Sequence, residues 1–159
     1  MAITTATGTK IYIGAAVSEA QADSLAEFIA MTNWVEIKQV ESLGEFGDQA
    51  TDVTFAALGD ARVRHAKGAR DAGTMAIVVG HDPVDAGQLA AIQAETTNDE
   101  FAFRVVLPDG PAGMTDSERF LRGLVASARL NVGANDNVIR TTFNVLISSE
   151  VFLQEVSTI

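Results

Sequence analysis

The side chains of this sequence that are best suited to chemistry are its two histidines, His65 and His81. His81 could bind a metal ion together with Asp82 and Asp85, if the three side chains met in an open coordination geometry. The two acids also fit the start of a helix, with Asp82 as the N-cap, Pro83 at the first helical position and Asp85 in the first turn. His65 lies among basic residues, which is more typical of a loop than of a general base. We therefore predict no metal site and no cofactor.

No catalytic motif accompanies the histidines. The sequence lacks a G-x-S-x-G elbow, a phosphate-binding loop and a G-x-G-x-x-G run after a strand. Neighbouring acids, such as Asp99 with Glu100 or Glu41 with Glu45, could act as general acid and base, but a solvated face explains them better. The chain has no cysteine, and so neither a disulfide framework nor a thiolate metal site. We predict that the protein is not an enzyme.

The composition is that of one folded domain. Of the 159 residues, 47% are hydrophobic and 20% are charged, and there are 13 glycines and 3 prolines. A chain of this length can bury one sizeable core but is short for two. We expect a single domain over residues 10–159, preceded by a flexible arm over residues 1–9. The start of the chain lacks the pattern of a signal peptide, and no apolar run approaches the roughly 18–20 residues that span a bilayer.

The charge is acidic overall and unevenly distributed. A net charge of −10 argues against wrapping a nucleic acid, because affinity for DNA comes mainly from basic side chains that neutralise phosphates. Four of the eleven basic residues lie within nine positions, namely Arg62, Arg64, Lys67 and Arg70. We interpret them as contacts to the acidic surface of another copy, with a solvated basic loop as the alternative. Residues 59–73 around them lack apolar periodicity, which predicts a long loop or extended hairpin that contributes to stacking of copies.

Alternation of apolar and polar residues dominates the chain and predicts strands. We expect strands over residues 10–14, 34–46, 52–55, 74–79 and 101–107, followed by two long strands on either side of residues 133–137. The alternation changes phase within residues 34–46, which predicts a β-bulge near Lys38 and Gln39. Residues 74–79 are nearly all apolar, which favours a central place in the sheet.

Two helices are predicted beside these strands. Residues 22–31 carry apolar side chains at helical spacing. Residues 82–95 form the second helix, which we expect to bury Leu89, Ala90 and Ile92 and to expose Gln88 and Glu95. The fold class is therefore mainly β, with a minor α+β character. We expect a β-sandwich or partly open barrel with one or two flanking helices.

Each of the two long strands near the end has an apolar face. The first face holds Phe120, Leu124, Ala126, Ala128, Leu130 and Val132. The second holds Ile139, Thr141, Phe143, Val145 and Ile147. Because alternate residues point to opposite faces of a sheet, we expect each set to share one face of its strand, with Arg140, Thr142, Asn144, Ser148 and Glu150 on the opposite face of the second strand.

Several segments resemble the tail tube proteins of long-tailed phages and phage-like gene transfer agents. The similar segments are IYIG, VESLGEFGD, DVTFAALGDARVRHAKGARDAGTMAIVVGHDP and ARLNVGANDNVIRTTFNV. The resemblance covers nearly the whole chain and implies a tail-tube-like β-sandwich subunit, with six copies per ring and stacked rings around a channel. It also implies a place in the tail of a virion or phage-like particle, assembled in the bacterial cytoplasm, with DNA passing through the lumen without specific binding.

The partners that this resemblance implies are further copies of the chain, together with tape measure, tail terminator and distal tail proteins. One alternative is a head–tail connector or tail terminator, which would form single rings. Another is a tube subunit of a contractile tail or type VI secretion system. A third alternative, a small-molecule-binding or enzymatic β-sandwich, would need a compact polar cluster that the sequence does not offer.

An acidic channel wall would let DNA slide, because phosphates would find no cationic site to bind. Glu41, Glu45 and Asp48 are our candidates for this wall, since they lie beside a strand corner on a face with few apolar residues. An acidic outer surface is the alternative for the same three residues, because alternation alone does not separate the two walls of a tube.

Overall fold

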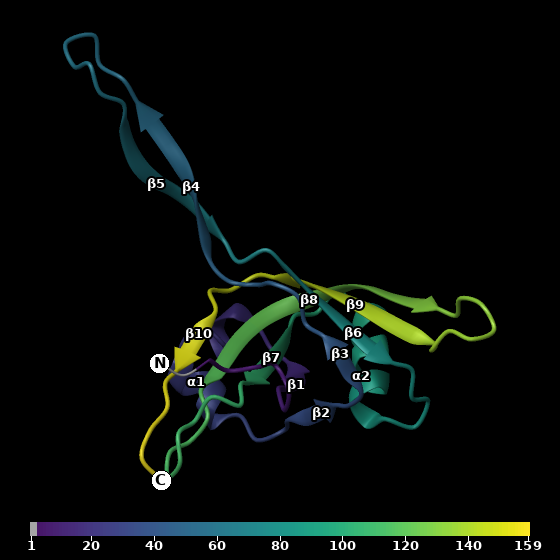
Figure 1. Ribbon diagram of the computed structural model, residues 1–159. Coiled ribbons are helices and arrows are strands. Elements are labelled where there is room, and N and C mark those ends of the chain that lie inside the picture. The colour runs from purple at the N-terminus through teal and green to yellow at the C-terminus, as the bar shows by residue number, and fades with distance from the viewer. Residues whose placement is uncertain (1–2) are drawn as a thin grey trace.

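The computed structural model describes residues 3–159, so that Met1 and Ala2, at the start of the expected arm, lie outside the described residues. Within residues 3–159 the chain forms ten strands, two α-helices and one short 3-10 turn (Figure 1). The strands are β1 (Lys10–Ala16), β2 (Val35–Ile37), β3 (Val40–Ser42), β4 (Gln49–Phe55), β5 (Arg64–Asp71), β6 (Thr74–Gly80), β7 (Phe101–Val106), β8 (Glu118–Asn131), β9 (Arg140–Ile147) and β10 (Phe152–Gln154). The helices are α1 (Leu25–Ala30) and α2 (Ala86–Glu95), and the turn η1 is Glu19–Gln21. The fold is mainly β, as the alternation predicted.

One antiparallel sheet forms the body, with its strands in the order β2-β1-β7-β8-β9-β6-β3 and with β10 paired to β8. β8 has 14 residues and belongs to both halves of this sheet. Residues 118–123 pair with β7, and residues 123–131 pair with β9. The second pairing shifts between Val125 and Ser127, a β-bulge of the kind that bends a strand. The sheet therefore curls, and its two halves face each other across the core.

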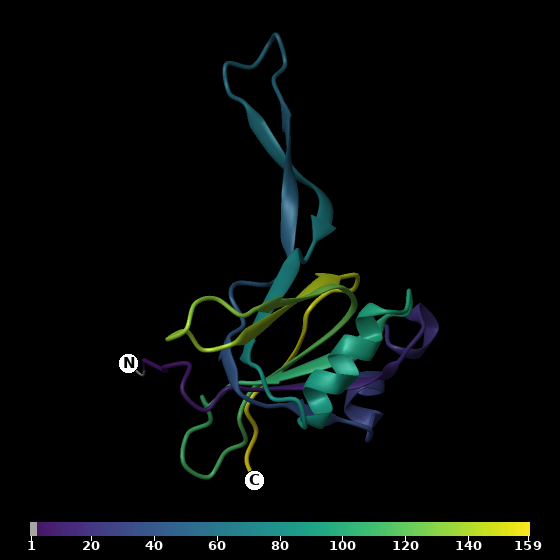
Figure 2. The ribbon, with the colours of Figure 1, turned by 90° about the vertical axis from the view of Figure 1, so that its right-hand side faces the viewer.

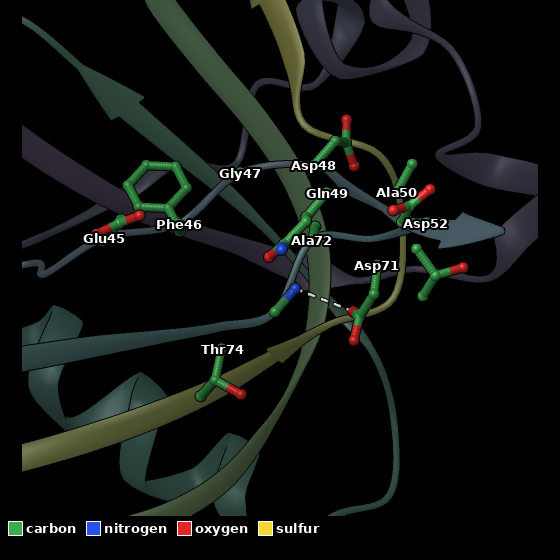
Figure 3. A pocket seen from close by; sticks show the side chains of 12 residues that line it. Glu45, Phe46, Gly47, Asp48, Gln49, Ala50, Asp52, Asp71, Ala72 and Thr74 are labelled. Carbon is green, nitrogen blue, oxygen red and sulfur yellow. Dashed lines mark hydrogen bonds between the residues drawn. The ribbon is translucent and has the colours of Figure 1, made fainter. Parts of the chain in front are cut away.

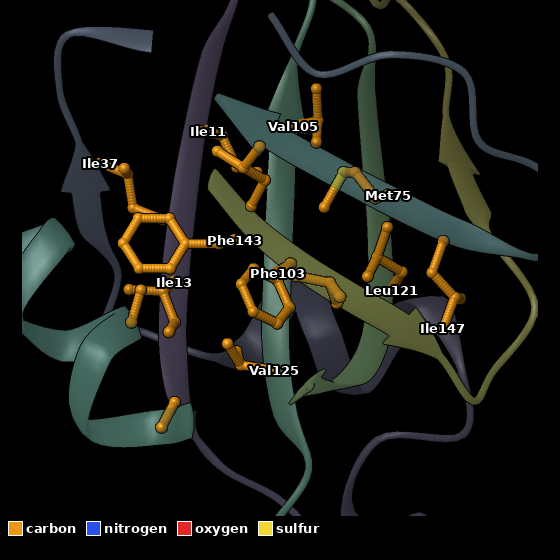
Figure 4. Packing of buried hydrophobic residues seen from close by; sticks show 14 of the residues in the cluster. Ile11, Ile13, Ile37, Met75, Phe103, Val105, Leu121, Val125, Phe143 and Ile147 are labelled. Atoms are coloured by element: carbon orange, nitrogen blue, oxygen red, sulfur yellow. The ribbon is translucent and has the colours of Figure 1, made fainter. Parts of the chain in front are cut away.

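The core takes alternate side chains from the strands of both halves (Figure 4). Its fully buried members include Ile11 and Ile13 of β1, Met75, Ile77 and Val79 of β6, Phe103 and Val105 of β7, and Phe143 and Val145 of β9. The apolar faces predicted for residues 10–14 and for residues 141–147 are thus confirmed, whereas Ile139, predicted on the second face, precedes β9 and is 41% exposed. A smaller cluster beneath α1 contains Phe28 and Phe120, whose ring centroids are 5.8 Å apart.

The face predicted for the first long strand is wrong in its first half, because this part of β8 is covered on both sides. Leu121 and Val125 enter the main core, whereas Phe120 enters the cluster beneath α1. The bulge then changes the phase, and Ala128 packs against the main core. One smaller prediction also fails, because β6 lies one place from the edge of the sheet instead of at its centre. The short helix predicted within residues 22–31 is present as α1, six residues long.

Residues 34–46 do not form one bulged strand, because the chain turns a corner at Lys38 and Gln39. β2 before the corner pairs with β1, and β3 after it pairs with β6, so the two strands occupy opposite edges of the sheet. Gln39 has a φ of 62°, a left-handed conformation that is uncommon for a residue other than glycine. The predicted bulge is therefore wrong, and the corner brings the two edges of the curled sheet together.

Two buried polar side chains at the start of α2 hold this corner. Asp85, in place of the predicted Asp82, is the N-cap of the helix. Its Oδ2 atom accepts hydrogen bonds from the backbone N–H groups of Gln88, at 3.0 Å, and of Lys38, at 3.2 Å. The Gln88 amide donates to the carbonyl oxygens of Lys38, at 3.1 Å, and Gly80, at 3.0 Å, and accepts from the backbone of Asp82 at 3.1 Å. One helix end thus joins β2, β3 and β6.

This contact decides which side of α2 is buried. Gln88 is 2% exposed, whereas Leu89 is 46% exposed and Ile92 is 39% exposed. The prediction that Gln88 faces solvent and that Leu89 and Ile92 are buried is therefore wrong. Gly87 faces β2, where an added Cβ atom would overlap the backbone of Glu36, so the helix approaches the strand through a residue without a side chain.

Replacing Gln88 by alanine should destabilise the subunit, because two partly buried carbonyl groups and one N–H group would lose their partner. We expect the free energy of unfolding to fall by about 2–3 kcal/mol. The matched control is Gln93→Ala, which changes an exposed residue of the same helix and should alter stability by less than about 0.5 kcal/mol. Urea denaturation of both variants measures the difference, and equal stabilities would contradict the role given to the corner.

Candidate assembly surface

β4 and β5 form a hairpin that stands clear of the body (Figures 1 and 2). Among residues 3–159 the two strands pair only with each other, and residues 56–63 form the tip. In the chain the hairpin comes between β3 and β6, which pair with each other at the edge of the main sheet. The segment 59–73 is therefore part of the tip and the returning strand of an extended hairpin, one of its two predicted forms.

The two faces of the hairpin differ in polarity. Residues opposite each other in an antiparallel pair share a face. The apolar face consists of the pairs Val53–Ala66 and Phe55–Arg64. The polar face consists of the pairs Asp52–Lys67 and Thr54–His65. Gly68 keeps the apolar face flat, because a Cβ atom there would lie 2.5 Å from the hydroxyl oxygen of Thr51 and 2.9 Å from a methyl group of Val53.

Large apolar side chains of the hairpin are open to solvent. Val53 is 51% exposed and Phe55 is 68% exposed, and at the tip Val63 is 52% exposed and Leu58 is fully exposed. No second layer of described residues covers them, although an isolated two-stranded ribbon is marginally stable in water. Contiguous exposed apolar groups of this kind mark surfaces of protein association.

The structure brings the four predicted contact residues, Arg62, Arg64, Lys67 and Arg70, together on this hairpin. Arg64 forms an ion pair with Asp60 at 2.9 Å, and Arg70 approaches Asp48 at 3.9 Å. Arg62 and Lys67 have no acidic partner within 4.0 Å among residues 3–159. Two of the four cations are thus partly neutralised within their own chain, and two are available to another one.

The three acids predicted to line a channel fall into two places. Glu45 and Asp48 line an open hollow of about 980 Å³ at the base of the hairpin, together with Asp52 and Asp71 (Figure 3). No lysine or arginine lines this hollow. Glu41 lies outside it on β3 and forms an ion pair with Arg140 of β9. The structure therefore gathers two of the three acids, one of which, Asp48, lies 3.9 Å from Arg70, and pairs the third with Arg140.

No group of three or more His, Asp or Glu side chains in residues 3–159 is placed to hold a metal ion. His65 contacts Asp52 at 2.9 Å on the exposed polar face of the hairpin. The pKa of Asp109 is lowered because the hydroxyl and backbone N–H of Ser117 donate hydrogen bonds to it, which fixes the turn between β7 and β8. Across residues 3–159, no helix has the length and apolar character needed to cross a membrane.

The apolar face of the hairpin was missed by the sequence analysis. Val53 and Phe55 alternate with polar residues just as the core strands do, so their pattern predicts a strand but not its surroundings. A signal did exist in the partner strand, because residues 64–71 contain no large apolar side chain. A strand with such a partner cannot belong to a two-layered core.

This fold and this surface are those of a mainly β structural subunit with an uncovered hairpin. Residues 6–144 match the model of a family described as phage tail tube protein, TTP. The chain therefore belongs to the phage tail tube protein family, whose members are structural components of phage tails. No curated protein sequence matches the chain significantly.

Three solved structures share the fold at low sequence identity. The SPP1 tail tube protein has 11% identity and a TM-score of 0.65, over 96% of this chain and 79% of that chain. The PVC sheath/tube terminator, from an extracellular contractile injection system in the extended state, has 9% identity and a TM-score of 0.69, over 98% of this chain and 99% of that chain. A chain of the anti-feeding prophage baseplate has 8% identity and a TM-score of 0.67, over 97% of both chains. At these identities the likeness concerns the fold alone.

The hairpin should open easily in the isolated subunit, because it has neither a third strand nor a covering layer. In unassembled protein we expect the amides of Val53 and Ala66 to exchange with solvent at least about 100-fold faster than those of Phe103 and Val145 in the core. Hydrogen exchange followed by mass spectrometry measures both regions in one sample. Equal protection of hairpin and core would show that the hairpin is stable without a partner.

Proposed function

We propose that this chain assembles with copies of itself into rings of six, which stack into a tail tube. The tube is the conduit through which a phage or a gene transfer agent particle delivers DNA. Residues 10–159 act as the single folding unit of the subunit, behind a short N-terminal arm. Membership in the tail tube family supports the tube, and the exposed apolar face of the β4–β5 hairpin is the observation that carries the mode of stacking.

Burial of the apolar face should contribute more free energy to stacking than the basic residues do. Burying one Val, Leu or Phe side chain is worth about 1.5–3 kcal/mol, and the hairpin exposes four such residues. An exposed ion pair contributes about 0–1 kcal/mol. Arg62 and Lys67 therefore act mainly on the rate and orientation of docking, through attraction to the acidic body of the next copy.

In this proposal the tube works with other tail proteins of the same particle. They are the tape measure, tail terminator and distal tail proteins, and assembly takes place in the bacterial cytoplasm. A terminator or head–tail connector role for this chain would need single rings that do not stack. A tube subunit of a contractile system would need a sheath around the tube.

Placing charges on the apolar face should abolish tubes while leaving the subunit folded. The test variant is Phe55→Asp with Leu58→Asp, and the matched control is Thr54→Asp on the polar face of the same strand. All these residues are exposed in the isolated subunit, so circular dichroism should be unchanged. Negative-stain microscopy should find tubes for the control and none for the test variant. Tubes from both would contradict stacking through this face, and single rings from the unmodified protein would favour a terminator or connector.

For the channel, we propose that Glu41, Glu45 and Asp48 contribute to an acidic wall. The support is the hollow that Glu45, Asp48, Asp52 and Asp71 line, with Arg70, 3.9 Å from Asp48, outside the lining. Phosphates that pass such a surface find no cation at which to bind. Glu41 contributes less, because Arg140 offsets its charge.

Changing Glu45 and Asp48 to lysine should allow tubes to form but slow DNA delivery, because each ring would then hold cations toward the phosphates. The control is Glu45→Gln with Asp48→Asn, which removes the charge without reversing it. Glu41 is left unchanged, since a lysine there would lie beside Arg140. Delivery is measured as transduction per assembled particle. A normal rate from particles with the two lysines would exclude these residues from the wall and leave the tube itself in place.

A further inference from the structure

The loop between β7 and β8 contains an aspartate directly before a glycine, Asp109–Gly110. No other aspartate in the sequence precedes a glycine, and no asparagine does. A peptide bond of this kind is open to spontaneous isomerisation, because the glycine has no side chain that hinders attack by its backbone nitrogen on the preceding carboxyl group. By its sequence, this is the most reactive aspartyl bond of the chain.

The isomerisation has two steps. The nitrogen of Gly110 forms a bond to Cγ of Asp109, and the amide hydrogen leaves with the carboxyl OH group as water, which closes a succinimide ring. Water then opens the ring at either of its carbonyl groups. One opening restores aspartate, and the other gives isoaspartate, in which the main chain runs through the side-chain carbon. The first step proceeds from the protonated carboxyl group, because an ionised oxygen is a poor leaving group.

The loop needs both members of this reactive pair. A Cβ atom on Gly110 would lie 2.7 Å from the carbonyl oxygen of Thr115 and 2.8 Å from Oδ1 of Asp116, so a residue with a side chain would force the backbone to move. The carboxylate of Asp109 binds Ser117 across the loop. Protection of the bond therefore has to come from neighbouring groups and not from a different residue at either position.

The reacting carboxylate is held by Ser117, eight residues further along the chain. Oδ1 of Asp109 accepts a hydrogen bond from the backbone N–H of Ser117 at 2.8 Å, and Oδ2 accepts one from the hydroxyl group at 2.5 Å. These two bonds lower the pKa of Asp109, and the charge of Arg119 adds to the effect. Ser117 is only 5% exposed, which limits its replacement by water. The carboxylate thus stays ionised and cannot turn without losing two donors.

The attacking nitrogen is held as well. The N–H of Gly110 donates a hydrogen bond to Oδ1 of Asp116 at 2.9 Å. Pro111 follows and restricts the backbone of Gly110 further. From the other side, the C-terminal residues fix the loop, because the N–H of Thr115 donates to the carbonyl oxygen of Ser157 at 2.8 Å. Turning the peptide unit toward the carboxyl group of Asp109 would break the bond to Asp116.

We propose that Ser117 and Asp116 protect the Asp109–Gly110 bond from isomerisation, Ser117 by holding the carboxylate and Asp116 by holding the attacking nitrogen. Both act as positioning residues. The inference is independent of the proposed function, because it concerns a loop within one subunit. Isoaspartate would add a carbon atom to the main chain between β7 and β8 and would remove the carboxylate that binds Ser117.

The test compares isomerisation in the folded chain and in the same chain unfolded in urea, at neutral pH. Trypsin cuts after Arg104 and Arg119, so residues 105–119 form one peptide. Liquid chromatography with electron-transfer fragmentation then measures isoaspartate at position 109. We expect the folded chain to isomerise at least about tenfold more slowly than the unfolded one. The same rate in both states would overturn the proposal.

Two variants of equal shape isolate the hydroxyl group. Ser117→Thr keeps this donor and should keep the protection, whereas Ser117→Val lacks it and should isomerise about tenfold faster when folded. In urea both should react at one rate, which separates the effect of the fold from that of the sequence. Circular dichroism checks that both variants are folded. Equal rates for the two folded variants would contradict the role of the hydroxyl group.

A further variant tests the nitrogen. Asp116→Ala removes the acceptor of the Gly110 N–H and should also accelerate isomerisation at position 109 in the folded chain. The matched control is Asp136→Ala, which removes an exposed acid outside this loop and should leave the rate unchanged. An unchanged rate for Asp116→Ala would overturn the part of the proposal that concerns Asp116.

Discussion

The hydrogen bonds between the start of α2 and the corner at Lys38 and Gln39 are the constraint on which the rest of the structure depends. The sheet begins with β2 at one edge and ends with β3 at the other, yet only two residues separate these strands in the chain. Curling the sheet is the only way to satisfy both pairings, and Asp85 and Gln88 supply the partners for the backbone groups that the corner exposes. Because these polar groups are buried, leaving them unpaired would cost about 1–3 kcal/mol each.

The corner also sets where the assembly surface points. β3 follows it directly, and the chain then rises into the β4–β5 hairpin before it returns as β6, the partner of β3. The joined ends of β8 and β9, residues 129–140, extend from the same half of the sheet. One curled half therefore carries two projections that leave the body in different directions (Figure 1). Exposed edges and apolar faces are a risk for a monomer, and the proposed assembly would cover those of the hairpin.

The sequence predicts the parts of this fold in which the alternation of apolar and polar residues alone decides which side chains are buried. Ile11 and Ile13, Phe103 and Val105, and Phe143 and Val145 alternate with polar residues and are buried as expected. The rule fails at Gln88, because an amide can be as buried as a leucine when three backbone groups bind it. It fails again at Phe55, which alternates with polar residues as a core strand does, although no second layer of described residues covers its hairpin. Local periodicity shows neither which backbone groups need a hydrogen-bond partner nor whether a second layer of residues covers a strand.

The distribution of charge bears on the contacts that we propose between copies. Outside residues 49–71 the chain holds seven basic and eighteen acidic residues, so the bodies of two copies repel each other. The hairpin holds four basic and three acidic residues and is nearly neutral. At physiological salt, repulsion between exposed charges fades beyond about 8 Å, and a projecting ribbon can make contact while the acidic bodies remain apart. In the proposed assembly, attraction would come from side chains such as Val53 and Phe55, which act only at van der Waals distance. Repulsion between the acidic bodies would then oppose random association of copies.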